Sequence, residues 1–150
     1  MKLTIRTIVT APLATVWAGF DRDLFNRLSP PFPPVRVLRF DGCKKGDVVS
    51  LELNFIFFKQ VWNSDIIDQQ SMPDRTRPDE IFFIDQGTKL PFFLSAWHHK
   101  HRLIRQGTGT VIADEITYQT PFRVLDYLFY PLLWAQFVYR KPIYRRVFGR

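Results

Sequence analysis

Six strand-like segments follow one another between residues 35 and 119, and helical patterns occur only before and after them. Apolar and polar residues alternate within the segments, and Gly, Pro and Asp punctuate the breaks, which is typical of antiparallel strands joined by short turns. The segments lie near 35–41, 47–58, 60–69, 80–86, 94–105 and 110–119. The part over Leu51–Phe58 is apolar on both faces, so we expect it to be well covered.

The flanking residues add one more strand and two short helices. Residues 2–9 alternate as another half-buried strand. Pro12 suits the first turn of a short helix, and a second short helix is expected near 22–28. Ser29–Pro34 is rich in proline and is expected to be an extended connector.

A long helix is expected over about 122–147, after Pro121. Pro131 and Pro142 lie inside it and are expected to kink or interrupt it. Its core-facing stripe is predicted to consist of Leu125, Leu128, Leu132, Ala135, Tyr139 and Ile143. The predicted fold class is therefore α+β, with a seven-stranded curved antiparallel sheet, two short helices after the first strand, and this helix over the concave face. Residues 1–150 are expected to form one domain.

Composition excludes several other classes of protein. Hydrophobic residues make up 46% of the chain and aromatic residues 16%, so a disordered chain is excluded. No apolar run reaches the ~18 residues of a membrane-spanning helix. Met1-Lys2 leads into an alternating segment and not into an apolar signal core, so we expect a cytoplasmic protein. Cys43 is the only cysteine; it can form no internal disulfide and is expected to be an incidental, exposed turn residue.

A series of short motifs occurs in a fixed order along the whole chain. They are Thr10-Ala11-Pro12 with Val16-Trp17, Pro30-Pro31, Phe83-x-Asp85, Pro91-Phe92, Trp97-x-His99-x-His101, Asp114-x-x-x-Tyr118-x-x-Pro121 and Phe137-x-Tyr139-Arg140. With these motifs the chain resembles the START-like or SRPBCC superfamily, whose fold is called a helix-grip, and within it a bacterial ligand-binding or cyclase/dehydrase-like subgroup. The resemblance implies a cavity for a hydrophobic small molecule such as a lipid, quinone or polyketide, and it does not choose among them.

A curved sheet that wraps one helix leaves a space between them, and this space is the default ligand site. We expect an elongated, mostly apolar cavity there. The ligand-binding side chains are predicted to include Phe55, Phe57, Phe83, Trp97, Tyr118, Leu128 and Leu132.

The strongest chemical signal is the pair His99 and His101. On a strand they share a face with Trp97, while the charged Lys100 and Arg102 occupy the other face, so both histidines are expected to point inward. If two residues close the hairpin that follows, Asp114 lies opposite one of the histidines on the same face. The sequence therefore predicts an inward cluster of His99, His101 and Asp114.

Several interpretations of this cluster remain open. It can be a buried polar network with a structural role, an anchor for a ligand oxygen, or an acid/base pair in which Asp114 orients a histidine. No nucleophile or phosphate-binding motif accompanies it, so we assign no catalytic residue, and His99, His101 and Asp114 are the candidates. Two histidines and one aspartate match a facial metal site in type, but histidines at i and i+2 are weak evidence, and we expect no metal and no cofactor. Binding or carriage of a hydrophobic molecule is the favoured function, and a cyclase/dehydrase-like enzyme is the alternative.

The expected C-terminal helix combines a second aromatic stripe with a basic end. Tyr127, Tyr130, Trp134 and Phe137 form the stripe, and residues 140–150 carry five basic residues and no acidic one. The stripe could be covered by the protein's own loops, by a second copy in a homodimer, or by the inner face of a membrane, and a protein that acts through this helix surface is a further alternative. Basic residues are not interleaved with exposed aromatic residues, so no nucleic-acid partner is expected.

Overall fold

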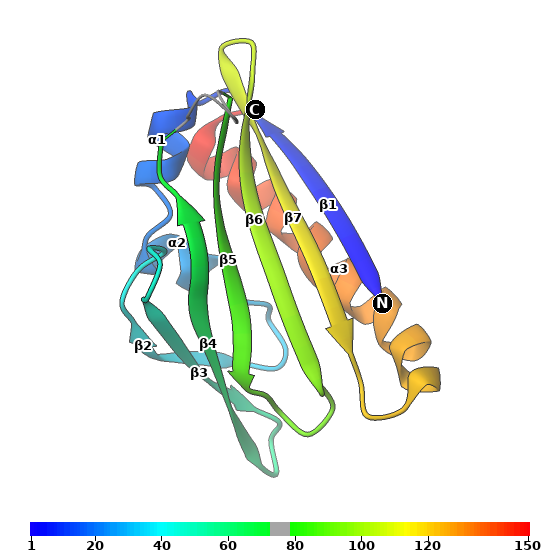
Figure 1. Ribbon diagram of the computed structural model, residues 1–150. Helices are drawn as coiled ribbons and strands as arrows, with labels where there is room; N and C mark the ends of the chain where they lie inside the picture. The colour runs from blue at the N-terminus through cyan, green and yellow to red at the C-terminus, as the bar shows by residue number, and fades with distance from the viewer. Residues whose placement is uncertain (73–78) are drawn as a thin grey trace.

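A computed structural model describes residues 1–72 and 79–150 of the chain (Figure 1). The strands are β1 (Lys2–Val9), β2 (Val35–Phe40), β3 (Val48–Asn54), β4 (Lys59–Gln70), β5 (Glu80–Lys89), β6 (Ala96–Gln106) and β7 (Gly109–Gln119). The helices are α1 (Leu13–Ala18), α2 (Arg22–Arg27) and α3 (Arg123–Phe148). The order and type of these elements agree with the sequence prediction.

The seven strands form one antiparallel sheet in the order β1-β7-β6-β5-β4-β3-β2. From β2 to β7 each strand pairs with the next in the sequence, and β1 completes the sheet by pairing with β7. The register between β4 and β5 shifts at two places, between Asn63 and Ser64 and between Ile66 and Asp68. Such irregularities bend a strand and increase its twist, which helps the sheet to curve.

Helix α3 crosses the sheet and packs mainly against β1 and β7, which lie at one side of it (Figure 1). Its C-terminal end is fixed to the residues after β1, because the amide of Ala11 donates to the carbonyl of Phe148 at 2.9 Å. One apolar core joins this end of the helix to α1 and α2, and another joins its first half to β1, β6 and β7. The concave side of β2 to β5 is therefore not filled by α3. No helix in the described part of the chain is both long and apolar enough to span a bilayer.

The predicted strand over 47–58 is too long by its last four residues. β3 ends at Asn54, and Phe55–Phe58 form the connection to β4, closed by a hydrogen bond of 2.9 Å from the Phe55 amide to the Phe58 carbonyl. The side chain of Phe57 is 94% exposed, so the expectation that this segment is well covered is wrong. The hairpin needs a turn at this point, and the residues that form it include no Gly or Pro to mark it.

The predicted core stripe of α3 is also wrong. Leu128 and Leu132 are 62% and 65% exposed, whereas the buried apolar side chains of this helix are Leu133, Phe137, Tyr144 and Phe148. Phe137, which the sequence placed on the second aromatic stripe, therefore belongs to the core, while the other three members of that stripe stay exposed.

Contacts at the start of α3 explain which face is buried. The Asp126 carboxylate accepts hydrogen bonds from the amide and the hydroxyl of Thr120 at 2.7 and 2.8 Å, and its carbonyl accepts one from the Tyr118 hydroxyl. These bonds fix the rotation of the helix about its axis. The helix continues through Pro131 and Pro142 without interruption, and both prolines are exposed, where water can satisfy carbonyl groups that the rings leave unpaired.

The burial of α3 gives a direct test on two leucines of one helix. Leu133→Ala should lower the free energy of unfolding by about 2–5 kcal/mol, because it removes a buried side chain. The matched control Leu128→Ala should change it by less than about 0.5 kcal/mol, because Leu128 is exposed. Urea unfolding followed by circular dichroism measures both values, and equal losses for the two variants would contradict this orientation of α3.

Candidate functional site

A cavity of about 750 Å³ lies between α2, the middle of α3 and the inner face of β2 to β6. Most of its wall is aromatic or aliphatic, with side chains that include Leu24, Phe40, Val49, Leu53, Trp62 and Phe129. The polar side chains in the wall include Ser64, Asp85, His99, His101, Gln136 and Arg140. The cavity therefore combines a large apolar space with a small number of polar groups, which is the usual composition of a small-molecule site.

The structure places only some of the predicted ligand-binding residues at this cavity. Its wall includes Phe55, Phe83, Trp97, His99, His101 and Leu132. The wall does not include Phe57, Asp114, Tyr118 or Leu128. Phe57 and Leu128 point to solvent, and Tyr118 is fully buried with its hydroxyl bonded to the Asp126 carbonyl.

The two histidines point inward because of the register of β6 and β7. Gly107 and Thr108 close the hairpin, with Gly107 at a φ of 59°, a conformation that glycine adopts without strain. His101 is consequently paired with Asp114. The side chains of His99, His101 and Asp114 are all buried, which confirms the inward placement predicted from the sequence.

The structure adds a second carboxylate, Asp85, which the sequence analysis did not assign to the cluster. β5 pairs with β6 so that Asp85 faces His99 across the strands. Oδ1 of Asp85 accepts a hydrogen bond of 2.9 Å from the indole N–H of Trp97. The alternation of β5 contained the signal for this position. Phe83 was assigned to the cavity wall, and Asp85, two residues later, has to share that face.

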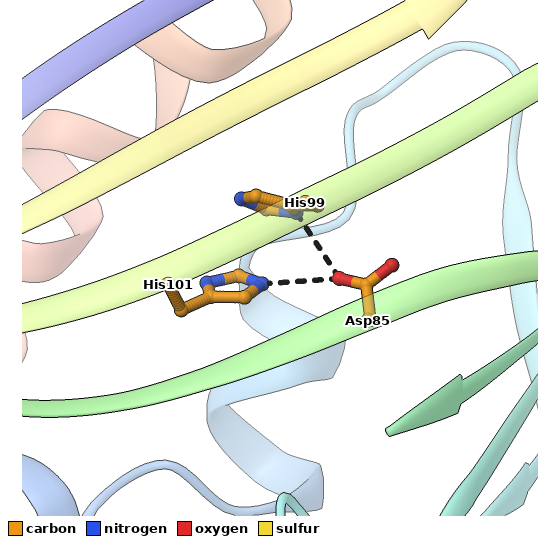
Figure 2. Close-up of side chains that lie close together, drawn as sticks. All are labelled: Asp85, His99 and His101. Atoms are coloured by element: carbon orange, nitrogen blue, oxygen red, sulfur yellow. Dashed lines mark ion pairs between the residues drawn. The ribbon is translucent and has the colours of Figure 1, made fainter. Parts of the chain in front are cut away.

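The four side chains form a compact arrangement in which each histidine lies between two carboxylates. Figure 2 shows Nδ1 of His99 and Nε2 of His101 directed at Asp85, and both atoms approach the same oxygen, at 3.2 and 3.3 Å. On the other side, Nε2 of His99 lies 3.0 Å from Oδ1 of Asp114 in a hydrogen bond. Nδ1 of His101 lies 3.1 Å from that oxygen, at ion-pair distance but without hydrogen-bond geometry.

These contacts decide which protonation states of the aspartates and of His99 are favoured. Burial by itself raises the pKa of Asp85 and of Asp114, but the interactions with the two histidines outweigh it, and both pKa values lie below the usual 3.8. Burial lowers the pKa of His99, but its interactions with Asp114 and Asp85 outweigh burial, and the pKa lies above the usual 6.5. The cluster therefore favours the ionised form of both carboxylates and the protonated form of His99.

This arrangement limits what the cluster can do chemically. Every ring nitrogen of His99 and His101 faces a carboxylate oxygen within 3.3 Å, so neither imidazole offers a free nitrogen to the cavity. Asp85, His99 and His101 each offer one ligand atom within 4.8 Å of the others and could hold a metal ion, for which His99 would have to lose its proton. The clearest roles for the cluster are structural support and the presentation of the Asp85 carboxylate.

Cys43 is not the exposed turn residue that the sequence suggested. It is half-buried in the cavity wall, and burial, with nearby aspartates, raises the pKa of its thiol to about 12. A thiol with such a pKa is a poor nucleophile at neutral pH.

Comparison with known proteins supports the fold and gives no closer relationship. No protein-family model and no curated protein sequence matches this chain. Among solved structures, norcoclaurine synthase from Thalictrum flavum in complex with dopamine and hydroxybenzaldehyde is 13% identical with a TM-score of 0.60, over 92% of this chain and 82% of that one. Ara h 8.0201 is 16% identical with a TM-score of 0.53, over 99% and 92% of the two chains.

A third similar structure is the Zhui aromatase/cyclase from Streptomyces sp. R1128, which is 16% identical with a TM-score of 0.52, over 81% of this chain and 70% of that one. The protein thus has the helix-grip fold that its resemblance to the START-like superfamily predicted.

The buried cluster predicts a stability that depends on pH in two directions. The aspartate pKa values are lowered by folding, so their contribution is present above about pH 3.8 and is lost as the pH falls through the folded values. The His99 pKa is raised by folding, so its contribution is full below about pH 6.5 and is lost as the pH rises through the folded value.

Urea unfolding between pH 2 and pH 10 should therefore show a decline on the acid side and another on the alkaline side. Titration of the imidazole protons by NMR should place the midpoint of His99 above 6.5. His98→Gln, which leaves the cluster intact, is the control and should keep the wild-type profile. A His99 midpoint below 6.5 would contradict this account of the cluster.

Proposed function

We propose that the protein binds or carries a small hydrophobic molecule, of lipid-, quinone- or polyketide-like type, in the cavity between the sheet and α3. The observation that carries this proposal is the size and character of the cavity, about 750 Å³ with a mainly apolar wall. Ligand pockets in proteins usually measure about 300–1,000 Å³ and have such walls. The similar fold of norcoclaurine synthase holds dopamine and hydroxybenzaldehyde, which supports the proposal that this fold can enclose small aromatic molecules.

The opening of the cavity supports the same function. Four side chains belong to the cavity wall and are also 59% to 70% exposed, so they form its mouth: Phe32, Phe92, Phe122 and Leu132. Exposed apolar groups around an opening cost solvation free energy unless they serve a contact, and apolar groups at a mouth allow an apolar ligand to pass.

A neutral fluorescent probe tests the proposed function. N-phenyl-1-naphthylamine should bind the wild-type protein with enhanced fluorescence, because it is apolar and uncharged. The double variant Leu51→Trp/Ser64→Trp places two large side chains in the cavity wall and should weaken binding by about tenfold or more. Ser95→Trp adds the same side chain at an exposed position and is the control. Absence of probe binding to the wild type, or equal binding to all three proteins, would contradict the proposal.

A cyclase/dehydrase-like enzyme is the second candidate, with His99 or His101 as acid/base and Asp114 as the orienting group. It is supported by the position of both histidines in the cavity wall and of Asp114 behind them. An acid/base step would require Asp85 to release a ring nitrogen, because both nitrogens of each histidine face carboxylates. The binding function needs no such rearrangement and is therefore preferred.

We further propose that the protein is cytoplasmic and that the mouth of the cavity meets the inner face of a membrane, where apolar ligands are dissolved. The mouth carries the apolar side chains that such a contact needs. The proposed contact does not rely on the basic residues after Arg140, because the C-terminal end of α3 lies at the opposite end of the helix from Phe122 (Figure 1).

Co-sedimentation with phosphatidylglycerol-containing vesicles tests this contact. We expect binding that persists at high salt, since it depends on apolar side chains, and that decreases in Phe92→Ser/Phe122→Ser. Val124→Ser, at an exposed position outside the cavity wall, is the control. A protein that ignores the vesicles and doubles its mass in light scattering would instead show that a second copy covers this surface.

A further inference from the structure

We propose that Arg140 binds the anionic end of the ligand, so that the cavity takes an amphiphile with a carboxylate group on an apolar body. This inference rests on the proposed function and names the class of molecule that the same cavity holds.

Arg140 is a cation in the cavity wall with no anion of its own. Its guanidinium lies over the ring of Phe137, with Cζ 4.2 Å from the ring centroid, and its Nε is buried without a hydrogen-bond partner. Among residues 1–72 and 79–150, no carboxylate lies within ion-pair distance of it. Arginine stays charged at any physiological pH, and a charge shielded from water is unfavourable until it is paired.

The carboxylates of the cluster do not pair directly with Arg140. Asp85 and Asp114 are each contacted by both His99 and His101 at 3.0 to 3.3 Å, and neither lies at ion-pair distance from Arg140. The guanidinium of Arg140 therefore has no carboxylate in contact with it at the polar part of the wall, where a ligand group can meet it.

Tyr144 places a buried hydroxyl beside Arg140. It lies one helical turn after Arg140 on the same face of α3 and is completely buried. Burial and the charge of Asp114 raise the pKa of this phenol, whereas the charge of Arg140 and hydrogen bonding with its side chain lower it, and the phenol stays neutral. Tyr144 is not part of the cavity wall, so Arg140 is the group that meets the ligand.

The rest of the wall defines the remainder of the ligand. Apart from a few polar side chains the wall is apolar, so the body of the ligand has to be apolar as well. The planar guanidinium donates two parallel hydrogen bonds to a carboxylate, and the stacking on Phe137 holds this plane in one orientation. A carboxylate at the end of an apolar body satisfies both parts of the site.

Two ligands with the same chain and different head groups test the inference. Dodecanoic acid and 1-dodecanol are each used to displace N-phenyl-1-naphthylamine from the wild type at pH 7.5. We expect the acid to bind about tenfold more tightly than the alcohol. Arg140→Met keeps the apolar stem and should abolish this preference by weakening the binding of the acid far more than that of the alcohol, and Arg140→Lys should retain part of the preference.

Arg145→Met removes a cation from an exposed position of the same helix and should behave as the wild type. Equal affinity of the wild type for the acid and the alcohol would overturn the role of Arg140 and leave the proposed function standing. A preference that survives in Arg140→Met would overturn it too. If neither the probe nor either ligand binds, the proposed function itself is wrong, and the inference fails with it.

Discussion

Two carboxylates, the half-buried Asp85 on β5 and the buried Asp114 on β7, set a condition that this part of the sheet has to meet. Asp114 is almost completely buried, and a buried charge without a partner costs several kcal/mol. β6 lies between these strands and supplies His99 and His101, each of which contacts both carboxylates. Strands β5, β6 and β7 are thereby held at one point by charge pairing as well as by backbone hydrogen bonds.

The position of α3 determines where the cavity next to this cluster of aspartates and histidines lies. The helix packs against β1 and β7. The inner faces of β2 to β5 are therefore not filled by the helix, and their side chains line the cavity. The same helix contributes Leu133 and Phe137 to one core and Tyr144 and Phe148 to the other, and its cavity-lining residues lie between Leu125 and Arg140. Arg140, in this cavity-lining stretch, is half-buried. Its charge therefore matters for the choice of ligand.

The sequence was informative where local rules decide the structure. The alternation in β6 and β7, with a two-residue turn between them, was enough to predict that Asp114 lies opposite His99 or His101, and the structure pairs it with His101. It was insufficient for α3, because that helix carries two apolar stripes and the periodicity does not distinguish between them. The choice depends on the contacts of Asp126 with Thr120 and Tyr118, which form only when the end of β7 meets the helix.

The two errors at the cavity wall also arose where local sequence rules do not decide the structure. Phe57 was placed in a strand because its neighbours are apolar and no turn residue marks the connection, so hydropathy alone suggested burial. Leu128 was assigned to the wall through the stripe that proved to be exposed. Asp85, in contrast, could have been found, because it shares a strand face with Phe83 and needed only the same alternation rule.

The pairing of β1 with β7 has a consequence for how the molecule reaches this structure. Lys2 pairs with Thr117, and the terminal amine donates to the Tyr118 carbonyl across 117 positions of the chain. Contacts so distant in sequence form late, because a long loop has to close before they are gained. The hairpins from β2 to β7 can assemble first, and their apolar inner face then stays open to water until β1 and α3 arrive. During that interval the nascent sheet is the species most prone to aggregate, and the one that a chaperone would have to protect.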